Sequence, residues 1–112
     1  MENLLTVALE AHHAEHNHHR HYKIAVGTDL FGQWTVSIRY GRVGQSGREL
    51  RYSAAKLDQL RGIVDDRLRR RVSAPRRIGC PYRLTSFNSA SGFDTSAFVA
   101  GNVLAWFLAT NG

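Results

Sequence analysis

Residues 22–44 read YKIAVGTDLFGQWTVSIRYGRVG, and this stretch decides the fold that we expect. Large apolar residues take every second position from Tyr22 to Val26 and again from Trp34 to Tyr40, which is the period of a strand with one buried face. Between the two runs, residues 27–33 contain two glycines and an aspartate, which are typical of a turn. The stretch therefore predicts two strands joined by a short connection.

The residues downstream complete an α+β domain. Residues 45–47 are a reverse-turn signal, after which residues 49–52 are expected to pair back on the preceding strand. Ser53 is a candidate N-cap for a helix that Pro75 ends, and residues 82–84 suggest a further strand. The apolar stripe of this helix is Leu57, Leu60, Ile63, Val64 and Leu68. We therefore expect a small antiparallel sheet of about four strands packed with one amphipathic helix.

Composition divides the chain into a His-rich leader (1–19), a central domain (20–86) and an apolar tail (87–112). In the leader, Leu5, Leu9, His12 and His16 fall at four-residue steps, which indicates a short helix. The tail is apolar around most of the circumference of a helix over residues 94–108. We expect this C-terminal helix either to dock on the sheet of its own chain or to form a homodimer contact.

Charge favours an acidic polymer as the partner. The 112 residues carry a formal net charge of +6, and residues 33–83 hold 13 Lys and Arg against 4 Asp and Glu, a balance of +9. A soluble basic surface without a specific partner is the alternative. The start of the chain does not resemble a secretory signal, and the longest apolar stretch, residues 97–109, falls short of the roughly 20 residues of a membrane span. We expect a cytoplasmic protein with access to the nucleoid and no membrane partner.

A second pattern lies within the same central stretch. Asp29-Leu30-Phe31-Gly32 is followed by Tyr40-Gly41-Arg42-Val43-Gly44, and an arginine-rich helix comes later. This combination, over roughly residues 20–84, resembles the WGR domain, which occurs in small bacterial proteins and in poly(ADP-ribose) polymerases. The family has a Trp-Gly-Arg signature where this chain has Tyr40, which keeps a stacking face but has less area and no indole donor. The resemblance implies a nucleic-acid-binding sheet, with Tyr40 as the aromatic contact and Arg42 as the basic one.

The arginines of the central domain suit phosphate, because a guanidinium matches phosphate oxygens with two parallel hydrogen bonds. Those on adjacent strands are expected to share one face, although Arg39 and Tyr40 do so only if residues 41–44 bulge or twist. Tyr40 can equally be a core residue, and the arginines at residues 69–71 can simply pair along the helix with Asp65 and Asp66. The predicted interface is Arg39, Tyr40, Gly41, Arg42, Arg48, Arg51, Arg69, Arg70, Arg71, Arg76 and Arg77. Trp34 and Phe31 are assigned to the core.

Six histidines crowd residues 12–21, and His12, His16 and His19 would share one face of a helix. That spacing can bind Zn²⁺, Ni²⁺ or Cu²⁺, but His-rich tracts also bind metal without function. We therefore expect no metal and no cofactor, with these three residues as the alternative. Whether their protonation near pH 6 strengthens anion binding is an open hypothesis.

The function that these observations predict is sequence-independent binding of nucleic acid, in particular the backbone or ends of DNA, through a basic face. Catalysis is not expected, because the central domain has no histidine beyond residue 21 and no nucleophile with an adjacent base. The alternative is a protein–protein interaction module of the same fold that does not bind nucleic acid.

Overall fold

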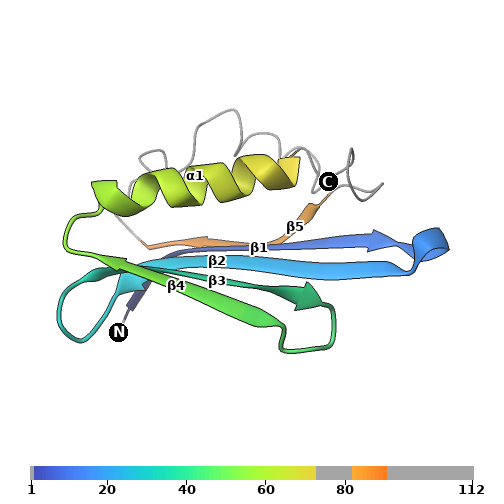
Figure 1. The fold of residues 1–112 in the computed structure, drawn as a ribbon, viewed down its shortest axis with the longest axis horizontal. Coiled ribbons are helices and arrows are strands. Elements are labelled where there is room, and N and C mark those ends of the chain that lie inside the picture. Colours follow the sequence, from blue (N-terminus) through green and yellow to red (C-terminus); the bar gives the residue numbers. More distant parts are fainter. Residues whose placement is uncertain (1, 73–81, 91–112) are drawn as a thin grey trace.

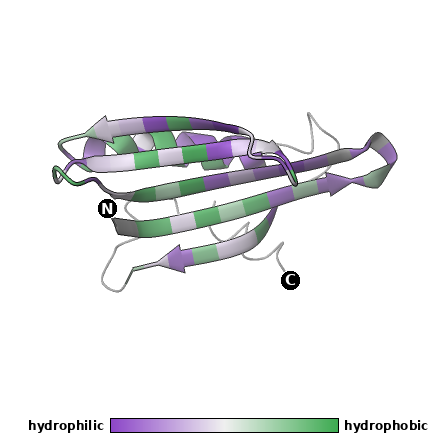
Figure 2. Ribbon diagram, turned by 90° about the horizontal axis from the view of Figure 1, so that it is seen from below, coloured by the Kyte–Doolittle hydropathy of each residue, from purple (hydrophilic) through white to green (hydrophobic). Residues whose placement is uncertain are grey.

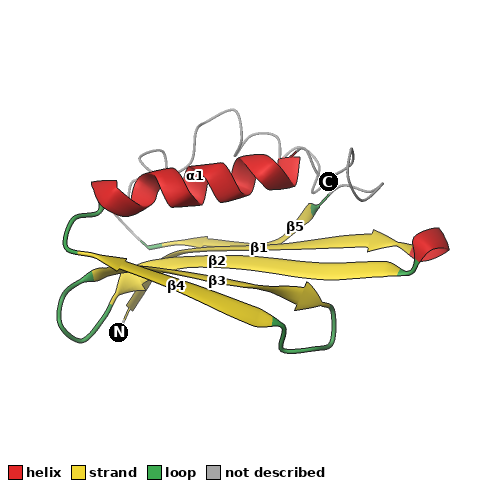
Figure 3. Cartoon of the chain, in the orientation of Figure 1, coloured by secondary structure: helices red, strands yellow, loops and turns green. Residues whose placement is uncertain are grey.

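A five-stranded antiparallel sheet carries one long helix across one of its faces in the computed structural model, which describes residues 2–72 and 82–90 (Figure 1). The spatial order of the strands is β4-β3-β2-β1-β5, and Figure 3 shows the two layers. In chain order the elements are β1 (Glu2–His13), the short 3-10 helix η1 (Ala14–His16), β2 (His18–Thr28), β3 (Trp34–Arg42), β4 (Arg48–Ala54), α1 (Asp58–Val72) and β5 (Arg83–Ser89). The predicted α+β class is confirmed.

The two strands read from residues 22–44 are present as β2 and β3. They pair with Tyr22 opposite Tyr40, and the apolar residues that follow pair with one another down to Val26 opposite Val36. Hydrophobic and hydrophilic residues alternate along the strands (Figure 2). This alternation assigns one face of the sheet to the core and leaves the other to solvent.

The segment expected to be a leader helix is strand β1, so that interpretation was wrong. Leu5, Val7 and Leu9 are buried at every second position, and β1 pairs with β2 on one side and with β5 on the other. A four-residue step is also two periods of a strand, so the spacing of Leu5 and Leu9 suits both structures. A short isolated helix is only marginally stable in water, whereas β1 pairs with β2 along its length and buries its apolar residues. The strand expected near residues 82–84 is confirmed as β5.

Helix α1 begins at Asp58, later than predicted, and Ser53 lies inside β4. The side chain of Gln59 accepts a hydrogen bond from the backbone N–H of Lys56 at 3.3 Å, just before the first turn of the helix. The helix buries Leu60, Val64 and Leu68 at four-residue steps, as the apolar stripe predicted.

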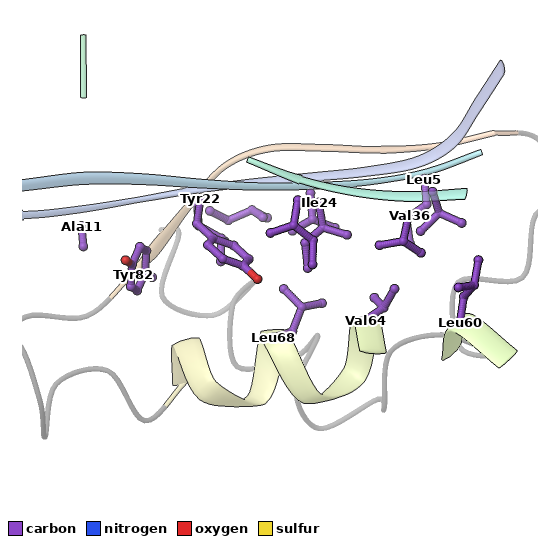
Figure 4. Packing of buried hydrophobic residues seen from close by; sticks show 14 residues of the cluster. Leu5, Ala11, Tyr22, Ile24, Val36, Leu60, Val64, Leu68 and Tyr82 are labelled. Atoms are coloured by element: carbon purple, nitrogen blue, oxygen red, sulfur yellow. The ribbon is translucent and has the colours of Figure 1, made fainter. Parts of the chain in front are cut away.

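The core lies between α1 and the sheet. Figure 4 shows Leu60, Val64 and Leu68 pointing from the helix toward the apolar side chains of the strands, among them Tyr22 and Ile24. Besides these helix residues, the core consists of Tyr82, just before β5, and of the strand residues Leu5, Val7, Leu9, Ala11, Tyr22, Ile24, Val26, Val36, Ile38 and Leu84. Burial of this set is the main favourable contribution to folding.

Three expectations lie outside the described residues. These are the C-terminal apolar helix in residues 91–112, the end of the first helix at Pro75, and the positions of Arg76 and Arg77. Among the described residues, no helix is long and apolar enough to cross a membrane.

Candidate nucleic-acid interface

The turn between β3 and β4 is a close crossing of backbone that only glycine permits. Gly47 has φ +70°, and a Cβ on it would lie 2.2 Å from the carbonyl oxygen of Tyr40. A Cβ on Gly41 would lie 2.8 Å from the Cα of Gly47. Because these distances are shorter than van der Waals contact, a side chain at Gly41 or Gly47 would force the backbone of the turn to move.

Tyr40 lies on the helix side of the sheet. Its Cα pairs with that of buried Tyr22, and the two ring centroids are 6.4 Å apart. The Tyr40 side chain is half-buried and packs against the edge of the core, so it is in part the core aromatic that one interpretation predicted. Strand alternation places Arg42 on the same side and Arg39 on the other. Residues 41–44 therefore do not bring Arg39 onto the surface of Tyr40.

Three exposed arginines lie beside Tyr40 on three neighbouring strands, and we call them the arginine row: Arg20, Arg42 and Arg48. Arg20 of β2 is directly opposite Arg42 of β3, and Arg48 of β4 is directly opposite Tyr40. Arg42 donates from Nη1 to the backbone oxygen of Asn17 and from Nη2 to its Oδ1, both at 3.1 Å. Within residues 2–72 and 82–90, no carboxylate pairs with a member of the row. Among the described residues, the row is thus a positive surface without a compensating carboxylate.

The arginines at the end of α1 have different surroundings. Arg69 pairs with Asp65 at 2.7 Å and Arg70 with Asp66 at 3.2 Å, so the pairing along the helix that one interpretation predicted is present. Arg71 turns toward the sheet, and its guanidinium carbon lies 3.9 Å from the ring centroid of Tyr22 and 5.7 Å from that of Tyr82. Arg69 and Arg70 are exposed, whereas Arg71 is half-buried.

The match of the chain to a family model agrees with this geometry. The WGR domain model matches residues 5–70, more than half of the 112 residues. The chain belongs to the WGR family. WGR domains are in general modules of the nucleic-acid-binding type. The matched range includes most of β1 as well as the Tyr40-Gly41-Arg42 signature segment. No curated protein sequence matches the chain.

The open face of the WGR sheet holds the other two predicted strand arginines. Arg39 and Arg51 both contact Glu49, at 3.4 Å and 3.7 Å, and Lys23 is directly opposite Arg39. Arg39 also donates to the backbone oxygen of Ser46 at 3.3 Å. The single face expected from four strand arginines is therefore divided between the two sides of the sheet. The pair on the open face is partly neutralised.

The turn between β2 and β3 of the WGR domain exposes two large apolar side chains. Leu30 is 84% and Phe31 is 90% exposed, so the assignment of Phe31 to the core was wrong, while Trp34 packs against the core as expected. The Asp29 carboxylate accepts hydrogen bonds from the backbone N–H groups of Phe31 and Gln33, each at 2.9 Å. This turn is closed by its own polar contacts and does not need a buried aromatic.

Sequence reasoning missed Arg20, which lies 22 positions before Arg42. Only the register of β2 against β3 brings the two residues together. The alternation of both strands was readable, but the pairing partner of Arg20 depends on the length and geometry of the 29–33 turn. Lys23 was missed for the same reason.

Proposed function

We propose that this WGR domain binds nucleic acid, and DNA in particular, through the arginine row and Tyr40. The observation that carries the proposal is the row itself, three exposed arginines on three adjacent strands without a carboxylate partner among the described residues. Like charges directly opposite one another in a sheet are destabilising. A polyanion relieves that repulsion, and its phosphate spacing suits a row of guanidinium groups.

Arg42 is the best-positioned member of the row. Its two hydrogen bonds to Asn17 fix the plane of the guanidinium, so less side-chain freedom is lost when a phosphate binds. A guanidinium has more N–H donors than the two that Asn17 engages, which leaves donors for a phosphate oxygen.

The chemistry of the row favours binding without sequence preference. Phosphate contacts from arginine position a protein on nucleic acid but carry no sequence information. Tyr40 exposes part of a ring beside Arg48, and an aromatic face stacks on any base or sugar. We therefore propose recognition of the backbone or an end, a role in binding without catalysis, and a location in the cytoplasm.

Binding to fluorescein-labelled blunt duplex DNA, with and without a 5′ phosphate, tests the proposal by fluorescence anisotropy across a salt series. We expect affinity that falls with salt for every duplex sequence, and a 5′-phosphate preference if ends are the target. The Arg20→Ala variant should bind more weakly, whereas Arg70→Ala, in which the arginine lost is paired along the helix, is the control. Absence of binding at low salt would refute the proposal and favour a protein partner for the same surface.

A further inference from the structure

Two histidines face each other across the β1–β2 hairpin. His12 and His19 are directly opposite, with ring centroids 5.1 Å apart and Nδ1 atoms 2.9 Å apart. Strand alternation places both on the open face of the sheet, away from α1 and from the arginine row. The expectation that His12, His16 and His19 share a helical face was wrong, but the strand register brings two of the three together.

The carboxylate of Glu10 contacts the ring nitrogen of His12 that faces away from His19. Glu10 Oε1 lies 2.8 Å from His12 Nε2, which therefore carries the proton that Glu10 accepts. In a neutral imidazole, a proton fixed on Nε2 leaves the lone pair on Nδ1, and here Nδ1 is the atom that points at His19. Metal-binding histidines typically have this outer carboxylate, which sets the tautomer and raises the basicity of the ligating nitrogen.

We propose that His12 Nδ1 and His19 Nδ1 together bind one divalent transition-metal ion, with Glu10 as the outer partner of His12. Imidazole nitrogen is a preferred ligand of Cu²⁺, Ni²⁺ and Zn²⁺. Two metal–nitrogen bonds of about 2.0–2.1 Å at a tetrahedral angle place the nitrogens about 3.3 Å apart. The observed separation of 2.9 Å thus has to open by only a few tenths of an ångström. The side chain of His12 is 48% exposed, so its ring can make that adjustment.

The described side chains supply two ligands to this site, and solvent would complete the coordination. Among the described side chains, no three His, Cys, Asp or Glu groups converge on one point that could hold a metal. His21, on the same face of β2, is held elsewhere, because its Nε2 lies 3.1 Å from the backbone oxygen of Gln45. With these described ligands alone, the pair has the open coordination of a site on the hairpin surface.

Metal binding requires one proton of the histidine pair to move. In the neutral pair, His19 Nδ1–H donates to His12 Nδ1, so metal binding requires that proton to leave His19 Nδ1. It moves to His19 Nε2 through solvent, and no net proton is released.

Isothermal titration of the full-length chain with Ni²⁺ and with Zn²⁺ tests the site. We expect one equivalent to bind, with an affinity lowered by about tenfold or more in His12→Ala, in His19→Ala and in Glu10→Ala. The matched control is His21→Ala, which removes an imidazole from the same strand and face. Melting temperatures of all variants establish that they are folded.

Imidazole ¹⁵N spectra locate the ligating atoms. We expect the Nδ1 signals of His12 and His19 to shift on metal addition while His12 keeps its Nε2 proton. Unchanged affinity in His12→Ala and His19→Ala would overturn the proposal. It would also be overturned by a loss of the same size in His21→Ala, since that result describes a histidine-rich segment without a defined site.

Discussion

The guanidinium of Arg71 lies over the ring of Tyr22, with 3.9 Å between the guanidinium carbon and the ring centroid. Tyr22 is almost fully buried, so this cation–π contact forms at the edge of the core and is partly desolvated. A partly desolvated cation–π contact contributes more to the free energy of unfolding than one at an exposed site. The neighbouring Arg69, which the sequence groups with Arg71, instead forms an ion pair with Asp65 on the outer surface of α1.

Arg71→Ala should therefore destabilise the fold more than Arg69→Ala. We expect losses in the free energy of unfolding of about 1–2 kcal/mol for Arg71→Ala, because ring contact and stem packing are both removed. For Arg69→Ala the loss should be about 0.5 kcal/mol, as for an exposed pair one helical turn apart. Urea denaturation measures both. Equal losses would mean that Arg71 is as solvated as its neighbour.

The hydroxyl of Tyr22 is buried without a hydrogen-bond partner among the described residues. Tyr22→Phe removes that uncompensated group and keeps the ring under Arg71, so we expect the free energy of unfolding at neutral pH to rise by about 1 kcal/mol. A clear loss of stability in thermal or urea unfolding would show that the hydroxyl has a partner.

The same hydroxyl makes stability depend on alkaline pH. Burial raises the pKa of Tyr22 above its ordinary value of 10.0, and nearby Arg71 and Arg67 oppose this shift. Below pH 10 the hydroxyl is protonated in the folded and in the unfolded chain. Above pH 10 the unfolded chain loses this proton first, because its pKa is the lower of the two. The stability that the group contributes therefore falls as the pH rises toward the folded-state pKa. Tyr22→Phe should remove this part of the decline above pH 10, which a series of melting temperatures would detect.

Two glycines of the β3–β4 turn should differ in their tolerance of a side chain. Gly47→Ala should destabilise the fold by about 3 kcal/mol or more, because its Cβ meets the Tyr40 backbone in addition to the cost of a positive φ. Gly44 also has a positive φ, +89°, but a Cβ there meets nothing within 4 Å. Gly44→Ala should thus cost only about 1–2 kcal/mol. Chemical denaturation compares them, and similar losses would contradict the close crossing.

Asp29 and Phe31 test what holds the exposed turn together. Asp29→Ala removes the acceptor of two backbone N–H groups, so we expect a loss of about 1–2 kcal/mol. Phe31→Ser should change the free energy of unfolding by less than about 0.5 kcal/mol, since its ring is exposed. If Phe31→Ser destabilised the protein as a core substitution does, by about 3 kcal/mol or more, the ring would have to be buried.

Periodicity in the sequence was enough to predict β2, β3 and the apolar stripe of α1, because each of these segments has one buried face and a period that suits only one structure. Strand β4 has no fully buried residue, and the turn before it predicted it instead. Failure in β1 came from a spacing of Leu5 and Leu9 that helix and strand share, although Val7 and Ala11 complete a two-residue period. The apolar character of Phe31 indicated that its ring is buried. The turn is instead held by the polar contacts of Asp29, and the ring of Phe31 points into solvent.

The candidate site was predictable only in part. Tyr40 and Arg42 follow from the signature and share one face because they are two residues apart on a strand. Arg39 and Arg51 were grouped with them, but their positions in the strands place them on the opposite face beside Glu49. The role of Arg20 depends on cross-strand register, which is a long-range property of the fold.

The central claim is that Arg42 contacts phosphate, and the salt dependence of DNA binding measures this most directly. The slope of log K against log salt concentration should be determined for the unaltered chain, Arg42→Ala and the charge-matched control Arg69→Ala. We predict that Arg42→Ala weakens binding to every duplex and lowers the slope by about one, while Arg69→Ala leaves the slope nearly unchanged. If both variants changed affinity and slope equally, net charge alone would account for binding, and the arginine row would not be the contact surface.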